Sequence, residues 1–218
     1  MSNSVGLLAL VASWAVYAVI HSLLASHWVK RRLAARCPQC LSGYRLFYNL
    51  LALGLLPVPL WLTFSLPGEP LWQWQGALAW LANGLALAAA LGFVYSLRFY
   101  DGSGFLGLRQ LREGHRELGE PEGLCISPLH RWVRHPWYTL GLVILWTRDM
   151  NAPLLVTALV ITAYFALGSR LEERKLLAQY GEAYARYRAA VPGLLPRPWR
   201  RLSAAQAAEL ERQGRQAG

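Results

Sequence analysis

Two charged segments of the sequence hold the residue types that could do chemistry. In the first, Arg134-His135-Pro136-Trp137-Tyr138, a cation and an imidazole precede a helix-starting proline and an apolar run. In the second, Glu172-Glu173, two adjacent carboxylates end another apolar run. Between the runs lies 150–153, Met-Asn-Ala-Pro, whose composition favours a turn. If both runs are helices, the turn brings the two charged ends together, and we predict that they bind a polar ligand at a membrane surface.

The composition indicates which elements position these ends. The chain is 55% hydrophobic and only 16% charged, whereas an ordinary soluble domain is about 25% charged. It contains ten Trp and ten Tyr, residues that favour membrane–water interfaces. Long stretches without any charge indicate an integral membrane protein. We therefore predict an all-α fold, a bundle of about five transmembrane helices.

The predicted spans follow the apolar runs, which are 5–26, 46–66, 75–97, 137–146 and 152–169. Pro57 and Pro59 are expected to kink the second span. The fourth run is short: even extended to Met150 it makes a helix of ~21 Å, less than the ~30 Å hydrocarbon core. The last two runs are expected to form a helical hairpin.

We predict that residues 1–218 form a single integral membrane domain. Its parts are a three-helix N-terminal part (1–97), a cofactor-binding part (98–198) and a basic tail (199–218). Within the first part, residues 27–45 are expected to form a basic loop. The chain after Ser169 is expected to be helical to about Ala190, and a cytosolic amphipathic helix is expected at the C-terminus.

The distribution of charge predicts the orientation. With five passes, all of the 22 Lys and Arg except Arg148 lie on one side. The positive-inside rule places that side in the cytoplasm and the N-terminus outside, in a bacterial inner membrane. The net charge of +10 is then a topology signal, and we expect no nucleic-acid partner.

Further polar residues are expected near the cytosolic ends of the spans. His21, Asn49 and Asp101 are the candidates for substrate binding. The alternatives are structural: a hydrogen bond between helices for His21, and a plain interfacial ion pair for Arg134 with Glu172 or Glu173.

A helical stripe follows Ser169, and it consists of Glu173, Leu177, Tyr180, Tyr184 and Tyr187. Two interpretations stay open for this stripe. It is either an amphipathic helix lying on the bilayer, or a lid whose tyrosines cover a cationic ligand through cation–π contacts.

The motif Cys37-Pro38-Gln39-Cys40 is a lone CxxC. Zinc needs four ligands, which only Cys125 and a histidine such as His27 could complete, so a metal site is not expected. Redox use stays a minor alternative. The glycines at 102, 104 and 107 do not follow a strand and form no dinucleotide fingerprint.

The residues after about 120 resemble a known superfamily. Val133-Arg134-His135-Pro136-Trp137-Tyr138, Glu172-Glu173-Arg174-Lys175-Leu176 and Tyr180-Gly181-Glu182-Ala183-Tyr184 are similar to the C-terminal half of membrane methyltransferases. That superfamily includes isoprenylcysteine carboxyl methyltransferases and phospholipid methyltransferases. The N-terminal half, with 20–26 and 44–49, looks more like the NnrU-type bacterial branch.

The resemblance implies an enzyme that uses S-adenosylmethionine and a lipophilic acceptor that enters from the bilayer. The acceptor would be an isoprenylcysteine-like carboxylate, a lipid amine or a small thiol, methylated at the cytosolic membrane face. The residues implied as catalytic are Arg134, His135 and Glu173, and those expected to bind the cofactor are His135, Tyr138, Glu172, Glu173 and Tyr184. A guanidinium suits the carboxylate of the donor, and His135 or a glutamate could act as base toward a thiol or amine.

The alternative is a non-catalytic membrane protein. Two histidines in an apolar bundle, His21 and His135, would suit a haem-binding electron carrier. A small transporter is the other possibility, although the sequence shows no pair of similar halves.

Overall fold

The structure is a computed structural model that describes residues 3–114 and 123–217. Its internal contacts divide the chain into two compact units, and each unit is described by itself. Unit 1 comprises Met1–Gln73, Tyr100–Glu120 and Asp149–Val160, and unit 2 comprises Trp74–Phe99, Pro121–Arg148 and Ile161–Gly218.

Long apolar helices dominate the chain. The described residues contain four that are long and apolar enough to cross a membrane: Ser4–Ala25, Pro38–Ser65, Gly76–Phe99 and Ala152–Ala190. Large apolar side chains point outward from them, with exposed fractions of 69% for Leu8, 76% for Phe64 and 83% for Trp80. Outward apolar surface on this scale is what lipid-facing helices present, which confirms the prediction of a helical membrane protein.

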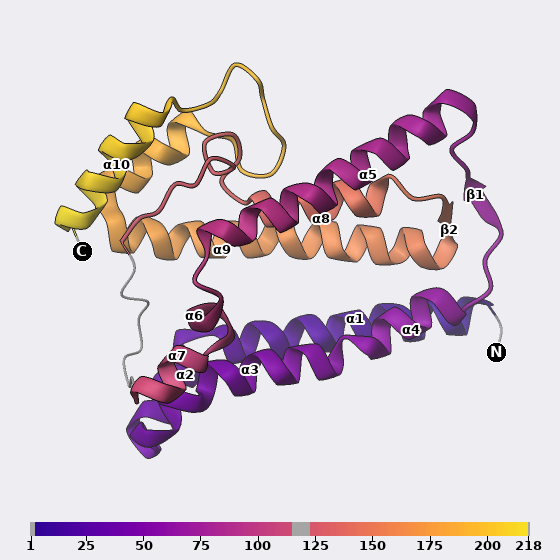
Figure 1. Cartoon of the computed structure of the whole chain (residues 1–218). Helices are drawn as coiled ribbons and strands as arrows, with labels where there is room; N and C mark the ends of the chain where they lie inside the picture. Colours follow the sequence, from indigo (N-terminus) through magenta and orange to yellow (C-terminus); the bar gives the residue numbers. More distant parts are fainter. Residues whose placement is uncertain (1–2, 115–122, 218) are drawn as a thin grey trace. The chain divides into compact units, whose positions relative to one another are not determined.

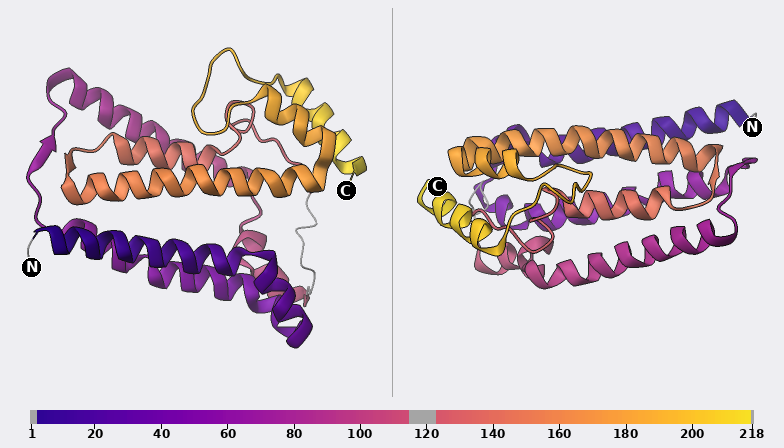
Figure 2. Two further views of the ribbon diagram at one scale, coloured as in Figure 1. Left: turned by 180° about the vertical axis from the view of Figure 1, so that it is seen from behind. Right: turned by 90° about the horizontal axis from the view of Figure 1, so that it is seen from above.

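In unit 1, helix α1 (Asn3–Ala25) runs beside α3 (Leu41–Leu55) and α4 (Pro57–Ser65) (Figures 1 and 2). The α3 and α4 helices are separated at Leu56, immediately before Pro57, where the sequence predicted a kink. Proline there lacks the backbone N–H that would continue the helical hydrogen bonds.

A buried polar network fixes the packing inside unit 1. The Trp14 Nε1–H donates to Thr157 Oγ1 at 3.0 Å, and the hydroxyls of Thr63 and Thr157 lie 2.7 Å apart. Thr63 also donates to the carbonyl of Pro59 at 2.7 Å. Such bonds between helices hold an apolar bundle in one register, because lipid offers these groups no other partner.

The prediction of a basic loop over 27–45 was wrong, because most of this segment is helical. Helix α2 (His27–Arg36) starts at Ser26, whose hydroxyl accepts from the Val29 N–H at 3.3 Å. A 3₁₀ turn, η1 (Pro38–Cys40), then leads directly into α3. Serine is a favoured N-cap residue and marks the start of a helix. The prediction of a loop rested on the positive charges and did not consider this residue.

Two short helices follow residue 100 in unit 1, α6 (Gly102–Leu106) and α7 (Leu108–Glu113). Gly107 joins them with φ +89°, and a Cβ there would lie 2.6 Å from the Leu46 nitrogen. Only glycine fits this close approach to α3.

A two-stranded antiparallel sheet in unit 1 was not predicted. Strand β1 (Pro70–Trp72) pairs with β2 (Met150–Asn151), with Pro70 opposite Asn151 and Trp72 opposite Met150. The strands are only three and two residues long and lie in segments whose composition favours turns, so nothing in the sequence indicated strand pairing.

In unit 2, α5 (Gly76–Ser96) lies along α8 (Pro136–Trp146) (Figure 1). The Trp137 Nε1–H donates to Ser96 Oγ at 2.8 Å. With 11 residues, α8 is ~16 Å long at about 1.5 Å per residue and is shorter than a bilayer core, as the sequence predicted.

Helix α9 (Ala152–Ala190) returns beside α8, with the Trp146 Nε1–H donating to Thr162 Oγ1 at 3.0 Å. Gly181 interrupts α9 with φ +52° and ψ −126°, a conformation open to glycine. The predicted stripe is therefore not on one continuous helical face. Its tyrosines beyond the kink are buried in a core that includes residues of α10 (Ala204–Ala217).

Candidate cofactor site

The start of α8 is held by a short segment that follows α9, residues 191–194. The backbone N–H groups of Arg134 and His135 donate to the carbonyls of Pro192 at 2.9 Å and Gly193 at 3.2 Å. The hydroxyl of Thr139 donates to the carbonyl of Leu194 at 2.6 Å. Pro136 occupies the first turn of α8, where its missing N–H costs no hydrogen bond. The two ends predicted to meet are therefore joined through the backbone.

A buried ion pair lies at this junction. Arg134 donates to Glu173 Oε1 from Nε at 2.9 Å and from Nη2 at 2.7 Å, and the two side chains are only 12% and 11% exposed. Its Nη1 donates to the carbonyl of Arg188 at 3.0 Å and to that of Val191. The guanidinium thus ties α9 and the segment after it to the start of α8. Most of its donors are used within the protein.

His135 bridges the two glutamates. Its Nε2 lies 3.0 Å from Glu173 Oε1 and its Nδ1 lies 3.4 Å from Glu172 Oε2. The imidazole is buried, while the Glu172 side chain is 50% exposed. The site therefore consists of one carboxylate fixed inside the protein and one that can meet a ligand.

An aromatic stack continues from the imidazole. The His135 and Tyr138 rings are nearly parallel, with centroids 5.4 Å apart, and Tyr138 stacks on Phe165 at 4.4 Å. The stack links the start of α8 to α9. Phe165 was not among the predicted site residues.

Burial and hydrogen bonding act in opposite directions on His135. Burial alone would lower the pKa of His135, but its hydrogen bonds to Glu172 and Glu173 outweigh burial and raise the pKa above the ordinary value. The neighbouring His130 has a pKa lowered to about 4, by burial and by the charge of His135. Of these two histidines, His135 is therefore the one whose surroundings favour the protonated form.

Replacing His135 by Gln is expected to remove a pH-dependent part of the stability. Because the folded pKa is raised, the stabilisation is complete below the ordinary value of about 6.5 and is lost as pH rises through the folded pKa. We expect the difference in thermal midpoint between the wild type and His135→Gln to shrink from about pH 6 to about pH 9. The exposed Leu195, which does not titrate, provides the control, since Leu195→Ala should leave a difference that does not change with pH. A constant difference for His135→Gln would contradict the prediction.

Tyr184 has a buried hydroxyl with no hydrogen-bond partner within the described parts of the chain. The residue is 1% exposed, and its ring packs edge-on against Tyr187 at 5.7 Å. Tyr184 follows Glu173 along α9, beyond the interruption at Gly181. An unsatisfied polar atom at such a depth is costly, and a bound ligand would satisfy it.

The predicted substrate residues lie in unit 1. The ring of His21 contacts the hydroxyl of Tyr48 at 2.6 Å, and both residues line a small apolar recess between α1 and α3. The Asn49 amide donates to the carbonyl of Phe105 at 3.0 Å. Asp101 caps α6 and pairs with Arg109 at 2.7 Å. Each has a structural role in its own unit, and their part in substrate binding stays a prediction.

The sequence predicted a helix to about Ala190 and assigned no role to the residues that follow it. In the structure, the backbone carbonyls of Val191, Pro192 and Gly193 accept the hydrogen bonds that hold Arg134 and His135. No group of three or more His, Cys, Asp or Glu suited to a metal occurs among the described residues.

Several curated proteins are similar to this chain over most of its length. Methanethiol S-methyltransferase 2 of Bradyrhizobium diazoefficiens is 34% identical over 184 residues, 84% of this chain and 70% of that protein. Methanethiol S-methyltransferase of Mycobacterium tuberculosis is 34% identical over 191 residues, 85% of this chain and 76% of that protein. The enzyme of Pseudomonas deceptionensis with the same name is 30% identical, covering 83% and 69%. No family model matches the chain, and no solved structure matches it.

Proposed function

Because this chain belongs to the methanethiol S-methyltransferase family, we propose that it transfers a methyl group from S-adenosylmethionine to a small thiol. The chain is a methyltransferase, which sets aside the alternative of a non-catalytic haem carrier or transporter. Of the three acceptor classes expected from the sequence, the relatives favour the thiol. We assign the reaction to the start of α8 because His135 is held there between the buried Glu173 and the half-exposed Glu172.

The residues present suit S-adenosylmethionine. The half-exposed carboxylate of Glu172 offers acceptors for its amino group or ribose hydroxyls. The Tyr184 hydroxyl offers a buried donor that no described residue uses. Tyr138, whose ring stacks on His135 and on Phe165, would hold the imidazole in place beside the cofactor. Arg134, whose donors are largely taken by Glu173 and by carbonyls, is a positioning residue in this proposal.

The bound cofactor would supply an electrophilic methyl group on its sulfonium. A thiol is a weak nucleophile until it loses its proton. In the proposal, His135 in its neutral form, with its proton on Nε2 facing Glu173, accepts that proton at Nδ1, the nitrogen on the side of the exposed Glu172. Glu173 holds Nε2 and thereby fixes the orientation of the ring. Transfer of that methyl group to the thiolate sulfur would be an in-line displacement that leaves S-adenosylhomocysteine, so the main help from the protein would be to position the thiol.

We place the reaction at the cytoplasmic face of a membrane. All but one of the 22 Lys and Arg fall on one side of the predicted five-span topology, and positive residues favour the cytoplasm. In this arrangement the N-terminus lies outside, α8 and α9 form the last hairpin, and the site opens where the water-soluble cofactor is available.

An acceptor panel tests the proposed reaction. Purified protein in lipid nanodiscs receives methyl-labelled S-adenosylmethionine with methanethiol, with a farnesylcysteine analogue, or with phosphatidylethanolamine. We expect labelled dimethyl sulfide from methanethiol, with much lower transfer to the other two acceptors. Transfer to either of these in preference to the thiol would reject the thiol assignment.

Replacing Tyr184 by Phe is expected to separate ligand binding from stability. The hydroxyl has no partner to lose among the described residues, so the thermal midpoint should stay equal or rise. If the hydroxyl contacts the cofactor, the loss of one neutral hydrogen bond of about 1 kcal/mol lowers the affinity for S-adenosylhomocysteine about fivefold. Isothermal calorimetry and thermal melts measure the two quantities.

Tyr187→Phe is the matched control. The Tyr187 hydroxyl donates to the carbonyl of His130 at 2.7 Å, so its loss should reduce stability and leave the affinity nearly unchanged. If both variants bind the cofactor product as the wild type does, Tyr184 is not a ligand.

A further inference from the structure

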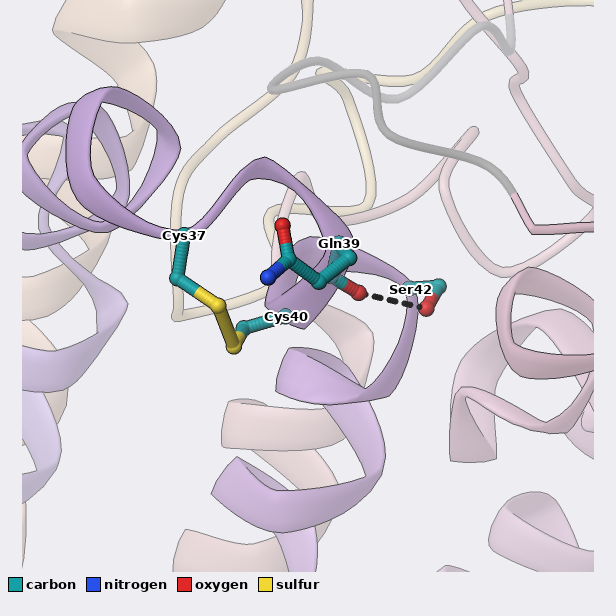
Figure 3. Close-up of a disulfide and its surroundings, with 4 residues drawn as sticks. All are labelled: Cys37, Gln39, Cys40 and Ser42. Carbon is teal, nitrogen blue, oxygen red and sulfur yellow. Dashed lines mark hydrogen bonds between the residues drawn. A yellow bond between two sulfur atoms is a disulfide. The ribbon is translucent and has the colours of Figure 1, made fainter.

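The CxxC motif forms a disulfide between α2 and α3 in unit 1. Cys37 and Cys40 are bonded to each other across the η1 turn (Figure 3). Cys37 ends α2 and is half-buried, while Cys40 is exposed and directly precedes the first residue of α3. The proposed methyl transfer makes no use of this bond.

Local hydrogen bonds already define the backbone around the disulfide. The Cys37 N–H donates to the carbonyl of Leu33 at 2.7 Å, and the Cys40 N–H donates to that of Cys37 at 3.0 Å. Ser42 donates from its hydroxyl to the carbonyl of Gln39 at 3.0 Å (Figure 3). A disulfide between residues three apart closes a very short loop and therefore restricts the unfolded chain least. Stabilisation of the fold therefore does not explain why this disulfide is present.

The surroundings favour thiol exchange. The exposed sulfur of Cys40 can be reached by a small thiol from solution. Arg36 adjoins Cys37 in the sequence, and the Lys30, Arg31 and Arg32 cations lie in the same short helix α2. Nearby positive charge stabilises a thiolate at Cys37, and the position at the start of α3 stabilises one at Cys40. Disulfides on the cytoplasmic side, where the charge distribution places this segment, are usually transient and redox-active.

We propose that Cys37 and Cys40 form a redox-active pair that exchanges with low-molecular-mass thiols. The thiolate of the small thiol attacks the Cys40 sulfur and forms a mixed disulfide, while the Cys37–Cys40 bond breaks and Cys37 leaves as a thiolate that takes up a proton. A second small thiol attacks the mixed disulfide and releases Cys40. Two small thiols are oxidised to one disulfide, and the cysteine pair is reduced to two thiols. The reverse reaction with an oxidised small disulfide restores the bond.

Glutathione titration of the full chain tests the proposal. Nanodisc-embedded Cys125→Ser protein, which lacks the other cysteine, is equilibrated at a series of reduced-to-oxidised glutathione ratios, quenched with acid, labelled with a maleimide and weighed by mass spectrometry. We expect two labels to appear together as the buffer becomes more reducing and to disappear when oxidised glutathione is restored. In the same background, Cys37→Ser should trap glutathione on the exposed Cys40.

Two outcomes would overturn the proposal. The pair could stay oxidised at every ratio and yield only to a strong reductant in denaturant, which would make it a structural disulfide. It could also carry two labels at every ratio, which would mean that no disulfide forms. Because the readout is mass and not methyl transfer, failure here would leave the proposed enzymatic function untouched.

Discussion

Replacing Glu173 by Gln is expected to give the largest loss of both stability and activity in this protein. The substitution leaves the buried guanidinium of Arg134 without a negative partner and replaces the charged acceptor of His135 Nε2 by a neutral amide oxygen. Breaking a buried ion pair from one side costs about 3–5 kcal/mol. We expect the thermal midpoint in nanodiscs to fall sharply and methyl transfer to methanethiol to become undetectable.

Glu182→Gln is the control for this prediction. Glu182 lies in the same helix, is 76% exposed and pairs with Arg186 at 3.4 Å on the surface. Exposed pairs of this kind are worth about 0–1 kcal/mol, so midpoint and activity should stay close to those of the wild type. Equal effects of the two substitutions would show that the Arg134–Glu173 pair is not the structural centre of the site.

Replacing Arg134 by Lys should give the second largest effect, although the charge is kept. The guanidinium reaches Glu173 with two nitrogens and the carbonyls of Arg188 and Val191 with the third. An ammonium group on a flexible stem cannot contact these groups together. A hydrogen bond to a charged group contributes about 1.5–3 kcal/mol to stability. We expect Arg134→Lys to lower the free energy of unfolding by an amount in this range.

The midpoint of thermal unfolding and the rate of proteolysis within 191–194 measure this effect, because Arg134 holds that segment. Arg186→Lys, on the exposed face of the same helix as Glu173, should change neither quantity. A wild-type midpoint and protease resistance in Arg134→Lys would mean that charge alone positions the site.

Much of the fold could be predicted from the positions of apolar runs and prolines. The apolar runs become helices, the second is interrupted next to Pro57, and α8 is short. The helical content of 27–36 was missed because positive charge was read as loop, although Ser26 offered a cap. The kink of α9 also went unpredicted, since Gly181 in a helical pattern gives no sign of a positive φ.

The sequence predicted which residues form the candidate site better than it predicted the contacts that these residues make. A turn between two helices brings the Arg-His pair and the Glu pair together, as expected. Sequence spacing could not tell which glutamate would be buried, because Glu172 and Glu173 are adjacent and differ only in the side of α9 they occupy. The sequence also could not show that Arg134 donates to the backbone carbonyls of Arg188 and Val191. Every residue has a backbone carbonyl, so the residue types give no sign of which carbonyl will be an acceptor.

Calorimetric titration of S-adenosylhomocysteine into wild-type protein, Glu172→Gln and Glu182→Gln tests most directly that the Glu172–His135–Glu173 cluster is the cofactor site. We predict that the wild type and Glu182→Gln bind alike. Glu172→Gln should keep the wild-type melting temperature, because its side chain is half exposed, and lose about 2 kcal/mol of binding, or about 30-fold in affinity. Absence of binding by folded wild-type protein, or wild-type affinity in Glu172→Gln, would contradict it.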